Sequence, residues 1–248
     1  MQTILIFGAT SSIAQACMHV WAQRKQVNKF VCVARNAAKL NAFIYDFLIR
    51  YPTVEIESHI VDFHDLDCIH TTIEQCFHQK IDQILIAQGV MFNNESDLSV
   101  KEIESLLQVN TISVAITTDC IYKYLQQQGS GIIGIIGSVA GDRGRKVNYL
   151  YGASKSFVAT YVEGLQHKAA LNNENIQISL IKPGPTASAM TQYLMASGKK
   201  LANVNDVARD IVLGMQKSKR VIYTPKIWQI IMFIIRHIPF FLFKKMDL

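Results

Sequence analysis

Short apolar runs alternate with longer amphipathic stretches along almost the whole chain, and this alternation predicts its fold. Four of the runs are apolar at successive positions, as expected for strands that helices cover on both faces. The expected strands span residues 3–7, 30–34, 54–61, 83–87, 132–137, 176–181 and 221–224. Between them, helical spacing of apolar residues covers residues 37–50, 65–79, 99–127, 149–172 and 204–217.

The first helical stretch shows the amphipathic pattern most clearly. Its apolar residues recur at intervals of three and four positions, at Ile13, Ala16, Cys17, Val20 and Trp21. Alternating β and α units imply right-handed crossovers. We therefore expect one α/β domain at residues 1–225, a Rossmann-type doubly wound parallel sheet of about seven strands with helices on both faces. An apolar, basic C-terminal helix follows in a tail at residues 226–248.

Composition narrows the class of protein. Half of the 248 residues are hydrophobic and 18% are charged, which supplies a sizeable core and argues against disorder. The net charge of +6 is moderate and comes from short runs of basic residues. Because no long basic tract is present, we expect no nucleic-acid partner. Phosphate groups or an anionic membrane surface suit these runs better.

The cysteines indicate the compartment. Five are present, an odd number, and they are widely spaced with no C-x-x-C pair. This pattern predicts reduced thiols, with neither a disulfide framework nor a zinc site, so we expect no metal. No signal peptide is recognised, because residues 3–7 already have the pattern of a buried strand. We expect a cytoplasmic protein.

A turn of small residues follows the first expected strand and leads directly into a helix. Such a turn lets backbone N–H groups at a helix N-terminus face a pyrophosphate. The alternative is an ordinary turn in which Ser11 or Ser12 caps the helix. The turn residues are Gly8, Ala9, Thr10, Ser11, Ser12, Ile13 and Ala14.

The second expected strand indicates which dinucleotide is bound. NAD-binding sheets commonly end this strand in an acidic residue that holds the ribose diol, whereas here it ends in Ala34 and Arg35. A cation suits a 2′-phosphate, so NADP(H) is favoured, unless Arg35 is simply a solvated surface residue. Asp62 and Phe63, after the third strand, are expected beside the adenine. Asp62 alone would equally suit a turn.

A Tyr–Lys pair provides candidate chemistry. Tyr151 and Lys155 lie at i and i+4, so a helix places them on one face. An ammonium roughly 4 Å from a phenol favours the phenolate by about 4 kcal/mol at an effective dielectric near 20. That brings the phenol towards the range in which a general acid/base works best. Ser138 would hold a substrate oxygen beside it. Alone, the Y-x-x-x-K spacing is weak, because both residue types are common on helix surfaces.

Taken together, these motifs resemble the short-chain dehydrogenase/reductase family over about residues 3–215. The order and spacing agree at every motif, so the set is far more specific than any member. The matching positions are the turn at Gly8, Asp62, Ala87-Gln88-Gly89, Asn110, Ser138, Tyr151, Lys155 and Pro183-Gly184.

The resemblance implies a catalytic tetrad. Tyr151 would exchange a proton with the substrate oxygen while nicotinamide gives or takes a hydride. Lys155 would hold the nicotinamide ribose, Ser138 would orient the carbonyl, and Asn110 would anchor a water that relays protons to Lys155.

It also implies cofactor contacts, and some positions depart from the family pattern. Ala87, Gly89, Pro183, Gly184 and Thr186 are expected around the cofactor. The first turn keeps one of three glycines, with Ser12 and Ala14 at the other two positions. The family's N-N-A-G is Ile86-Ala87-Gln88-Gly89 here, so asparagines that brace the central strands are missing.

A narrower resemblance concerns residues 8–14, residues 138–152 and the apolar tail. These segments look like the branch that contains the decaprenylphosphoryl-keto-ribose reductases, which reduce a keto sugar carried on a polyprenyl phosphate lipid. The resemblance would place Arg143, Arg145 and Lys146 near the substrate mouth, where a cationic cluster could hold a lipid phosphate. A solvated charged loop is the alternative.

The tail has the pattern of a surface helix. At residues 226–245 its longest uncharged stretch is 227–235, too short to span a membrane. A stripe of six isoleucines with lysines at both ends favours a helix in the headgroup region, with Trp228 and the phenylalanines buried. This would bring the protein to the inner face of the membrane. An arm packed on another subunit is the alternative, and we expect a homo-oligomer, a dimer or a tetramer.

The function expected from these residues is NADP(H)-dependent interconversion of a ketone and a secondary alcohol. The substrate would be a small or lipid-linked carbonyl compound, with a keto sugar on a polyprenyl phosphate as the specific candidate. Reduction of a soluble ketone or an acyl intermediate is the alternative within enzymes. A non-enzymatic NADP-binding sensor would not need all four tetrad residues, and a membrane-docked scaffold would explain only the tail.

Overall fold

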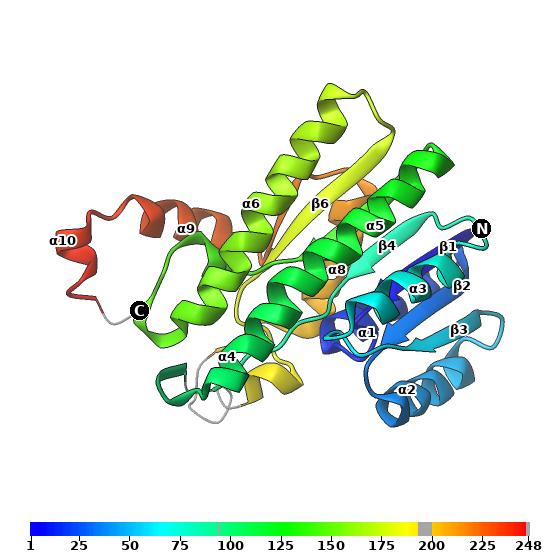
Figure 1. Cartoon of the computed structure of the whole chain (residues 1–248), viewed down its shortest axis with the longest axis horizontal. Helices are drawn as coiled ribbons and strands as arrows, with labels where there is room; N and C mark the ends of the chain where they lie inside the picture. Colours follow the sequence, from blue (N-terminus) through cyan, green and yellow to red (C-terminus); the bar gives the residue numbers. More distant parts are fainter. Residues whose placement is uncertain (94, 193–199, 247–248) are drawn as a thin grey trace.

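Seven parallel strands form one sheet in the order β3-β2-β1-β4-β5-β6-β7 (Figure 1). The computed structural model describes residues 1–93, 95–192 and 200–246. All seven expected strands are confirmed, with ends that differ from the prediction by at most three residues. The strands are β1 Gln2–Phe7, β2 Val27–Ala34, β3 Glu55–Ile60, β4 Gln83–Ile86, β5 Gly131–Ile136, β6 Ile176–Pro183 and β7 Val221–Thr224.

Helices cover both faces of the sheet, which confirms the doubly wound architecture (Figure 1). Successive residues of β1 point to opposite faces, so Leu5 and Phe7 join one hydrophobic core while Ile4 and Ile6 join the other. Helices α3, α5 and α6 pack on the first face, and α1, α2 and α8 pack on the second. The helices are α1 Ser12–Gln23, α2 Ala37–Arg50, α3 Leu66–Cys76, α4 Val100–Leu107, α5 Ser113–Gln128, α6 Tyr149–Leu171, α8 Val204–Gln216, α9 Ile227–His237 and α10 Phe240–Phe243.

The strand order reverses between β1 and β4, and this is where open α/β sheets bind their ligands. Gly8 follows β1 at this point with φ of 76°, in the left-handed region that favours glycine. A Cβ atom at Gly8 would lie only 2.5 Å from the backbone nitrogen of Gln88, after β4. The one glycine kept in this turn therefore lets the two strand ends meet.

The single helix expected at residues 99–127 is wrong, because the segment is divided into three parts. A capping box between Ser99 and Glu102 begins α4. A π-helix at Gln108–Ile112 then separates α4 from α5. Asn110 is at its centre and is fully buried. Such bulges frequently mark functional sites, and apolar periodicity does not reveal them.

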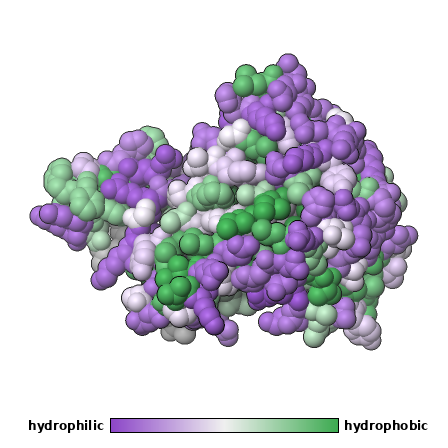
Figure 2. All heavy atoms as spheres, viewed as in Figure 1, coloured by the Kyte–Doolittle hydropathy of each residue, from purple (hydrophilic) through white to green (hydrophobic). Residues whose placement is uncertain are grey.

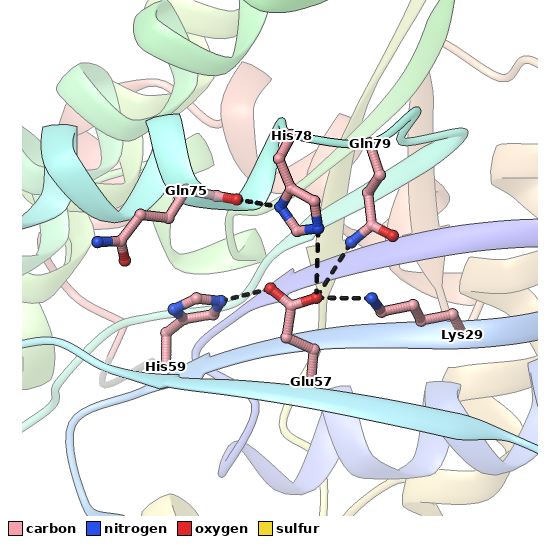
Figure 3. Close-up of polar contacts among 6 residues, drawn as sticks. All are labelled: Lys29, Glu57, His59, Gln75, His78 and Gln79. Atoms are coloured by element: carbon pink, nitrogen blue, oxygen red, sulfur yellow. Dashed lines mark hydrogen bonds and ion pairs between the residues drawn. The ribbon is translucent and has the colours of Figure 1, made fainter.

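A polar network joins β2 and the edge strand β3 to the segment that follows α3 (Figure 3). The Glu57 carboxylate is its centre, 2.6 Å from Lys29 Nζ and 2.8 Å from His59 Nε2. Gln79 Nε2 donates to the same carboxylate at 3.2 Å. Partial burial raises the pKa of Glu57, but the hydrogen bonds and charges of Lys29 and His59 outweigh it and hold the pKa below its usual value. Charged side chains of this kind protect an edge strand from pairing with other chains.

Helices α9 and α10 project to one side of the domain (Figure 1). Met232 is fully buried against the domain, whereas Ile230, Phe233 and Ile234 on the same helix are exposed. The predicted stripe of six isoleucines is therefore divided, with Ile231, Ile235 and Ile238 only partly exposed. Within the described residues, no helix is both long and apolar enough to cross a bilayer.

Candidate active site

Helix α6 presents Tyr151 and Lys155 together, as the spacing predicts. Lys155 Nζ lies 5.7 Å from the centroid of the Tyr151 ring. The lysine is 3% exposed, and it donates a hydrogen bond to the carbonyl oxygen of Ile136 at 3.1 Å, where β5 ends. Burial lowers the pKa of Lys155 from 10.5 to about 8, because a low dielectric disfavours the ammonium. The Lys155 ammonium therefore loses its proton at a pH closer to neutrality than an exposed lysine does.

Ser138 follows β5. The segment that begins with Ser138 packs closely against the first turns of α6, because small residues lie at the contact. A Cβ atom at Gly141 would lie 2.6 Å from the Lys155 carbonyl carbon, and one at Gly152 would lie 2.9 Å from the Ala140 oxygen. The absence of both side chains lets the Ser138 segment approach the α6 backbone. Ser138 Oγ accepts a hydrogen bond from the backbone N–H of Ala140 at 3.1 Å. Since the hydroxyl acts there as an acceptor, its proton is left to donate to a substrate oxygen.

Asn110 is fixed by its own hydrogen bonds. Its Oδ1 accepts from the Val90 N–H at 2.8 Å, and its Nδ2 donates to the Val90 oxygen at 2.9 Å and to Ser154 Oγ at 3.2 Å. Gly89 separates it from Lys155, because a Cβ there would lie 3.3 Å from Asn110 Oδ1 and 3.5 Å from Lys155 Nζ. All four predicted tetrad residues are therefore gathered around α6 and the ends of β4 and β5.

Gln88 links the end of β4 to α5, next to Ile86 and Ala87, where the family's two asparagines are missing. Its side chain is buried, and Nε2 donates to Thr117 Oγ1 on α5 at 3.2 Å. The sequence interpretation recorded only the loss of the two asparagines. The longer amide reaches α5 instead, which could not be inferred without knowing where α5 lies.

The turn at Gly8 leads into α1 with its first N–H groups free of side-chain caps. Ser11 is the N-cap residue in extended conformation, but its side chain accepts no hydrogen bond from the helix. Ser11 capping, the alternative interpretation of this turn, is therefore wrong. Thr10, Ser11, Ser12 and Ile13 are partly exposed around an uncapped helix N-terminus, an arrangement that suits an anion.

The other predicted cofactor contacts have different surroundings. Arg35 is exposed just beyond the end of β2. Asp62 is exposed and its Oδ1 accepts from the His64 N–H at 3.1 Å, as expected of a turn residue. The Phe63 ring is packed in the hydrophobic core. Only the main chain of Phe63 remains available for the predicted cofactor contact.

The segment after β6 is braced by β7 and by the tail. Gly184 donates its N–H to the Thr224 oxygen at 2.9 Å, and Thr186 Oγ1 donates to the Gly184 oxygen at 2.8 Å. Trp228 of α9 packs against Gly184 so closely that a Cβ atom there would overlap the indole. The prediction that Trp228 is buried in a lipid headgroup layer is therefore wrong. Its sequence context, an apolar stripe, gave no sign of this partner.

A buried ion pair fixes the far end of the Ser138 segment. Lys182 Nζ on β6 lies 2.5 Å from Asp142 Oδ1, and the Tyr223 hydroxyl on β7 donates to Asp142 Oδ2 at 2.8 Å. The Asp142 side chain is 2% exposed. Burial and the hydrogen bond to Asp142 both raise the pKa of Tyr223, so its proton stays in this contact. The sequence analysis did not single out any of the three.

Arg143 holds the end of α9. Its Nη1 donates to the carbonyl oxygens of Ile235 and Ile238, both at 2.6 Å, and its guanidinium lies 4.0 Å from the Phe243 ring centroid. The expected cluster of Arg143, Arg145 and Lys146 is therefore divided, because the Arg143 guanidinium is hydrogen-bonded to the tail. Lys146 is exposed, and burial lowers the pKa of Arg145.

Comparison with known proteins agrees with this geometry. The short chain dehydrogenase family matches residues 2–198. An uncharacterized oxidoreductase of Staphylococcus aureus is 23% identical over 218 residues, which covers 88% of this chain and 92% of the relative. A short-chain dehydrogenase from Sphingobium yanoikuyae in complex with NADPH has a TM-score of 0.80 at 22% identity, over 91% of this chain and 89% of that one. ElxO with NADP bound has a TM-score of 0.78 at 18% identity, over 90% and 96%. The chain therefore belongs to the short chain dehydrogenase family of oxidoreductases.

Proposed function

We propose that this protein is an NADP(H)-dependent reductase that converts a ketone to a secondary alcohol. The observation that carries the proposal is the Tyr151–Lys155 pair on α6, with Lys155 buried and Ser138 beside the start of the same helix. When bound, the cofactor supplies a hydride to the carbonyl carbon. The protein must then hold the carbonyl oxygen and give it a proton.

The tetrad divides this work among its members. The Ser138 hydroxyl donates a hydrogen bond to the carbonyl oxygen, while the Ser138 oxygen accepts the Ala140 N–H. Tyr151 transfers a proton to that oxygen as the alkoxide develops. Lys155 stabilises the resulting phenolate through its charge. Asn110 holds the loop after β4 against α6 and keeps its Oδ1 next to the Lys155 ammonium across Gly89.

Several features support NADP(H) as the cofactor. The uncapped N-terminus of α1 and the close turn at Gly8 fit a pyrophosphate. Arg35 is exposed at the end of β2, where it would attract a 2′-phosphate and where NAD-binding sheets place an acid. The structural neighbours named above carry NADPH and NADP. Gly184 and Thr186 would adjoin the nicotinamide.

We further propose that the substrate is lipid-linked and that the tail rests on the inner face of an anionic membrane, with a keto sugar on a polyprenyl phosphate as the specific candidate. The exposed apolar side chains of the tail gather beside hydrophilic ones at its outer end (Figure 2). A groove of about 390 Å³ between β7 and α9 adds the Arg236 guanidinium and the His237 imidazole to the apolar Ile230 and Phe233. Since Trp228 of the same helix touches Gly184, the membrane would lie close to the active site. The exposed tail face consists of Ile227, Ile230, Phe233, Ile234, Phe240, Phe241 and Leu242.

The reductase proposal is tested by Tyr151→Phe. We expect NADPH to bind as before, measured by its fluorescence, while ketone-dependent NADPH oxidation is lost. Retention of more than roughly a tenth of kcat, about 1.4 kcal/mol in the barrier, would exclude Tyr151 as the general acid. A protein that binds NADPH but reduces no ketone in either form would instead be a sensor.

The membrane proposal is tested by co-sedimentation with vesicles of phosphatidylglycerol and phosphatidylcholine. We expect the parent chain to sediment and a triple variant, Phe233→Ser, Phe240→Ser, Phe241→Ser, to stay in the supernatant with its activity on a small ketone intact. These exposed positions are preferable to truncation, since removal of the tail would uncover Gly184. A parent chain that stays in the supernatant as a stable dimer would show that the tail is an arm between subunits.

A further inference from the structure

The first turn of α6 is capped by a residue far away in the sequence. Glu95 lies in a 3₁₀-helix, Glu95–Asp97, between β4 and α4, and it is 4% exposed. One carboxylate oxygen accepts the Leu150 N–H at 2.7 Å, and the other accepts the Tyr151 N–H at 2.9 Å. Both hydrogen bonds have good length and are charge-assisted. Glu95 therefore binds directly to the backbone of the proposed general acid.

Helix α6 has no cap of its own. Asn148 stands at its N-cap position, but the Asn148 side chain makes no capping hydrogen bond. The first N–H groups of a helix have no partner within the helix, and an uncapped first turn frays. A carboxylate at this end also interacts favourably with the helix dipole. Because Tyr151 is the third residue of α6, the turn that Glu95 secures is the turn that carries the phenol.

The same loop is held at a second point of the site. Val90, five residues before Glu95, is paired with the Asn110 side chain through both its N–H and its carbonyl oxygen. Asn110 in turn donates to Ser154 on α6. The segment after β4 is thus attached to α6 directly through Glu95 and indirectly through Asn110. A displacement of this segment would move Tyr151 relative to Ser138 and Lys155.

We propose that Glu95 is a positioning residue for Tyr151, a buried carboxylate that fixes the first turn of α6 so that the phenol meets the substrate oxygen. This inference rests on the proposed reductase function. It goes beyond the tetrad, because Glu95 acts on the backbone of Tyr151 and is distant from it in sequence. Misplacement of a reacting group by a fraction of an ångström is enough to lower a catalytic rate strongly.

The test compares Glu95→Ala and Glu95→Gln with a matched control, Glu102→Ala. Glu102 also accepts a backbone N–H at a helix N-terminus, that of Ser99 in its own capping box, but it is partly exposed and far from the tetrad in its contacts. We expect Glu95→Ala to lower kcat at least tenfold while the Kd for NADPH changes less than twofold. Glu95→Gln retains one carbonyl acceptor and should keep an intermediate kcat. Glu102→Ala should stay within twofold of the parent.

Two further measurements separate positioning from general loss of stability. In a Tyr151→Phe background, Glu95→Gln should lower the residual rate no further, because the two changes affect one step. Hydrogen exchange should accelerate at the first turn of α6 in Glu95→Gln and not in Glu102→Ala. If Glu95→Gln retains the parent kcat and the parent exchange rates, the inference is wrong. Because hydrogen exchange does not depend on chemistry, it still tests the contact if Tyr151→Phe proves active and the reductase proposal fails.

Discussion

The indole of Trp228 lies against Gly184, so the first turn of α9 forms part of the support of the segment that follows β6. The contact joins two parts of the chain that the sequence assigns to different roles, the catalytic domain and the tail. Because a bulky side chain at residue 184 has no room beside the indole, the glycine is required by packing as well as by any cofactor.

Gly184→Ala should therefore destabilise the protein by about 1–3 kcal/mol, the usual cost of overpacking. Trp228→Ala removes the obstructing ring, so the double variant should be less destabilised than the sum of the two single changes. Urea denaturation of the four proteins gives the coupling energy. Additive effects would mean that the indole does not press on residue 184.

Arg143→Ala should loosen the tail, because it leaves carbonyl oxygens at the end of α9 without their donor. Hydrogen bonds to a charged group contribute about 1.5–3 kcal/mol. We expect faster tryptic cleavage after Lys226 and faster hydrogen exchange in α9. Arg50→Ala serves as the control, since Arg50 forms an exposed pair with Asp46 and should change little. Equal cleavage of the two variants would contradict the role of Arg143.

Gly89→Ala should lower kcat, because its methyl group would enter the space between Asn110 Oδ1 and Lys155 Nζ. Both neighbours are buried and held by hydrogen bonds, so neither moves easily. A fall of about tenfold, or 1.4 kcal/mol, is expected in steady-state assays. Gly164→Ala is the matched control, since that helical position is open and the change should stabilise α6 by about 0.5–1 kcal/mol.

Lys155 should make the stability of the cofactor-free protein rise with pH. Its pKa is about 8 in the folded state, below its ordinary value of 10.5, so the unfolded chain binds more protons between these values. The free energy of unfolding should increase through this window by about 3 kcal/mol from this residue alone. Denaturation at pH 7.5, 9 and 10.5 measures it, with Lys155→Met as the comparison. A Lys155→Met protein with the same slope would assign the effect to other groups.

Arg35→Asp should narrow the preference for NADPH over NADH, because it replaces attraction to the 2′-phosphate with repulsion. Fluorescence titration with both cofactors measures the change. Raised salt should weaken NADPH binding to the parent more than to the variant, because salt screens the attraction between the exposed Arg35 side chain and the 2′-phosphate. An unchanged preference would mean that Arg35 faces only solvent.

The sheet, most of the helices that cover it and the candidate tetrad could be predicted from the sequence alone. Apolar runs such as residues 83–87 and 132–137 are local signals, and a strand covered on both faces needs little else to define it. Tyr151 and Lys155 were predicted from helical spacing, and Asn110 and Ser138 were added to them by the resemblance to the family. Each of these predictions needs only the order and spacing of residues along the sequence.

The residues that support this site from distant parts of the sequence could be identified only from the folded structure. Three contacts join segments that are far apart in the chain. Glu95 accepts the N–H of Tyr151, Trp228 packs against Gly184, and Arg143 donates hydrogen bonds to the end of α9. The π-helix at Asn110 likewise interrupts an apolar periodicity that continues through it. Local patterns report which face of an element is buried, but not which partner buries it. That choice depends on how all the layers pack at once, because side chains fill the interior at crystal-like density and each contact constrains its neighbours.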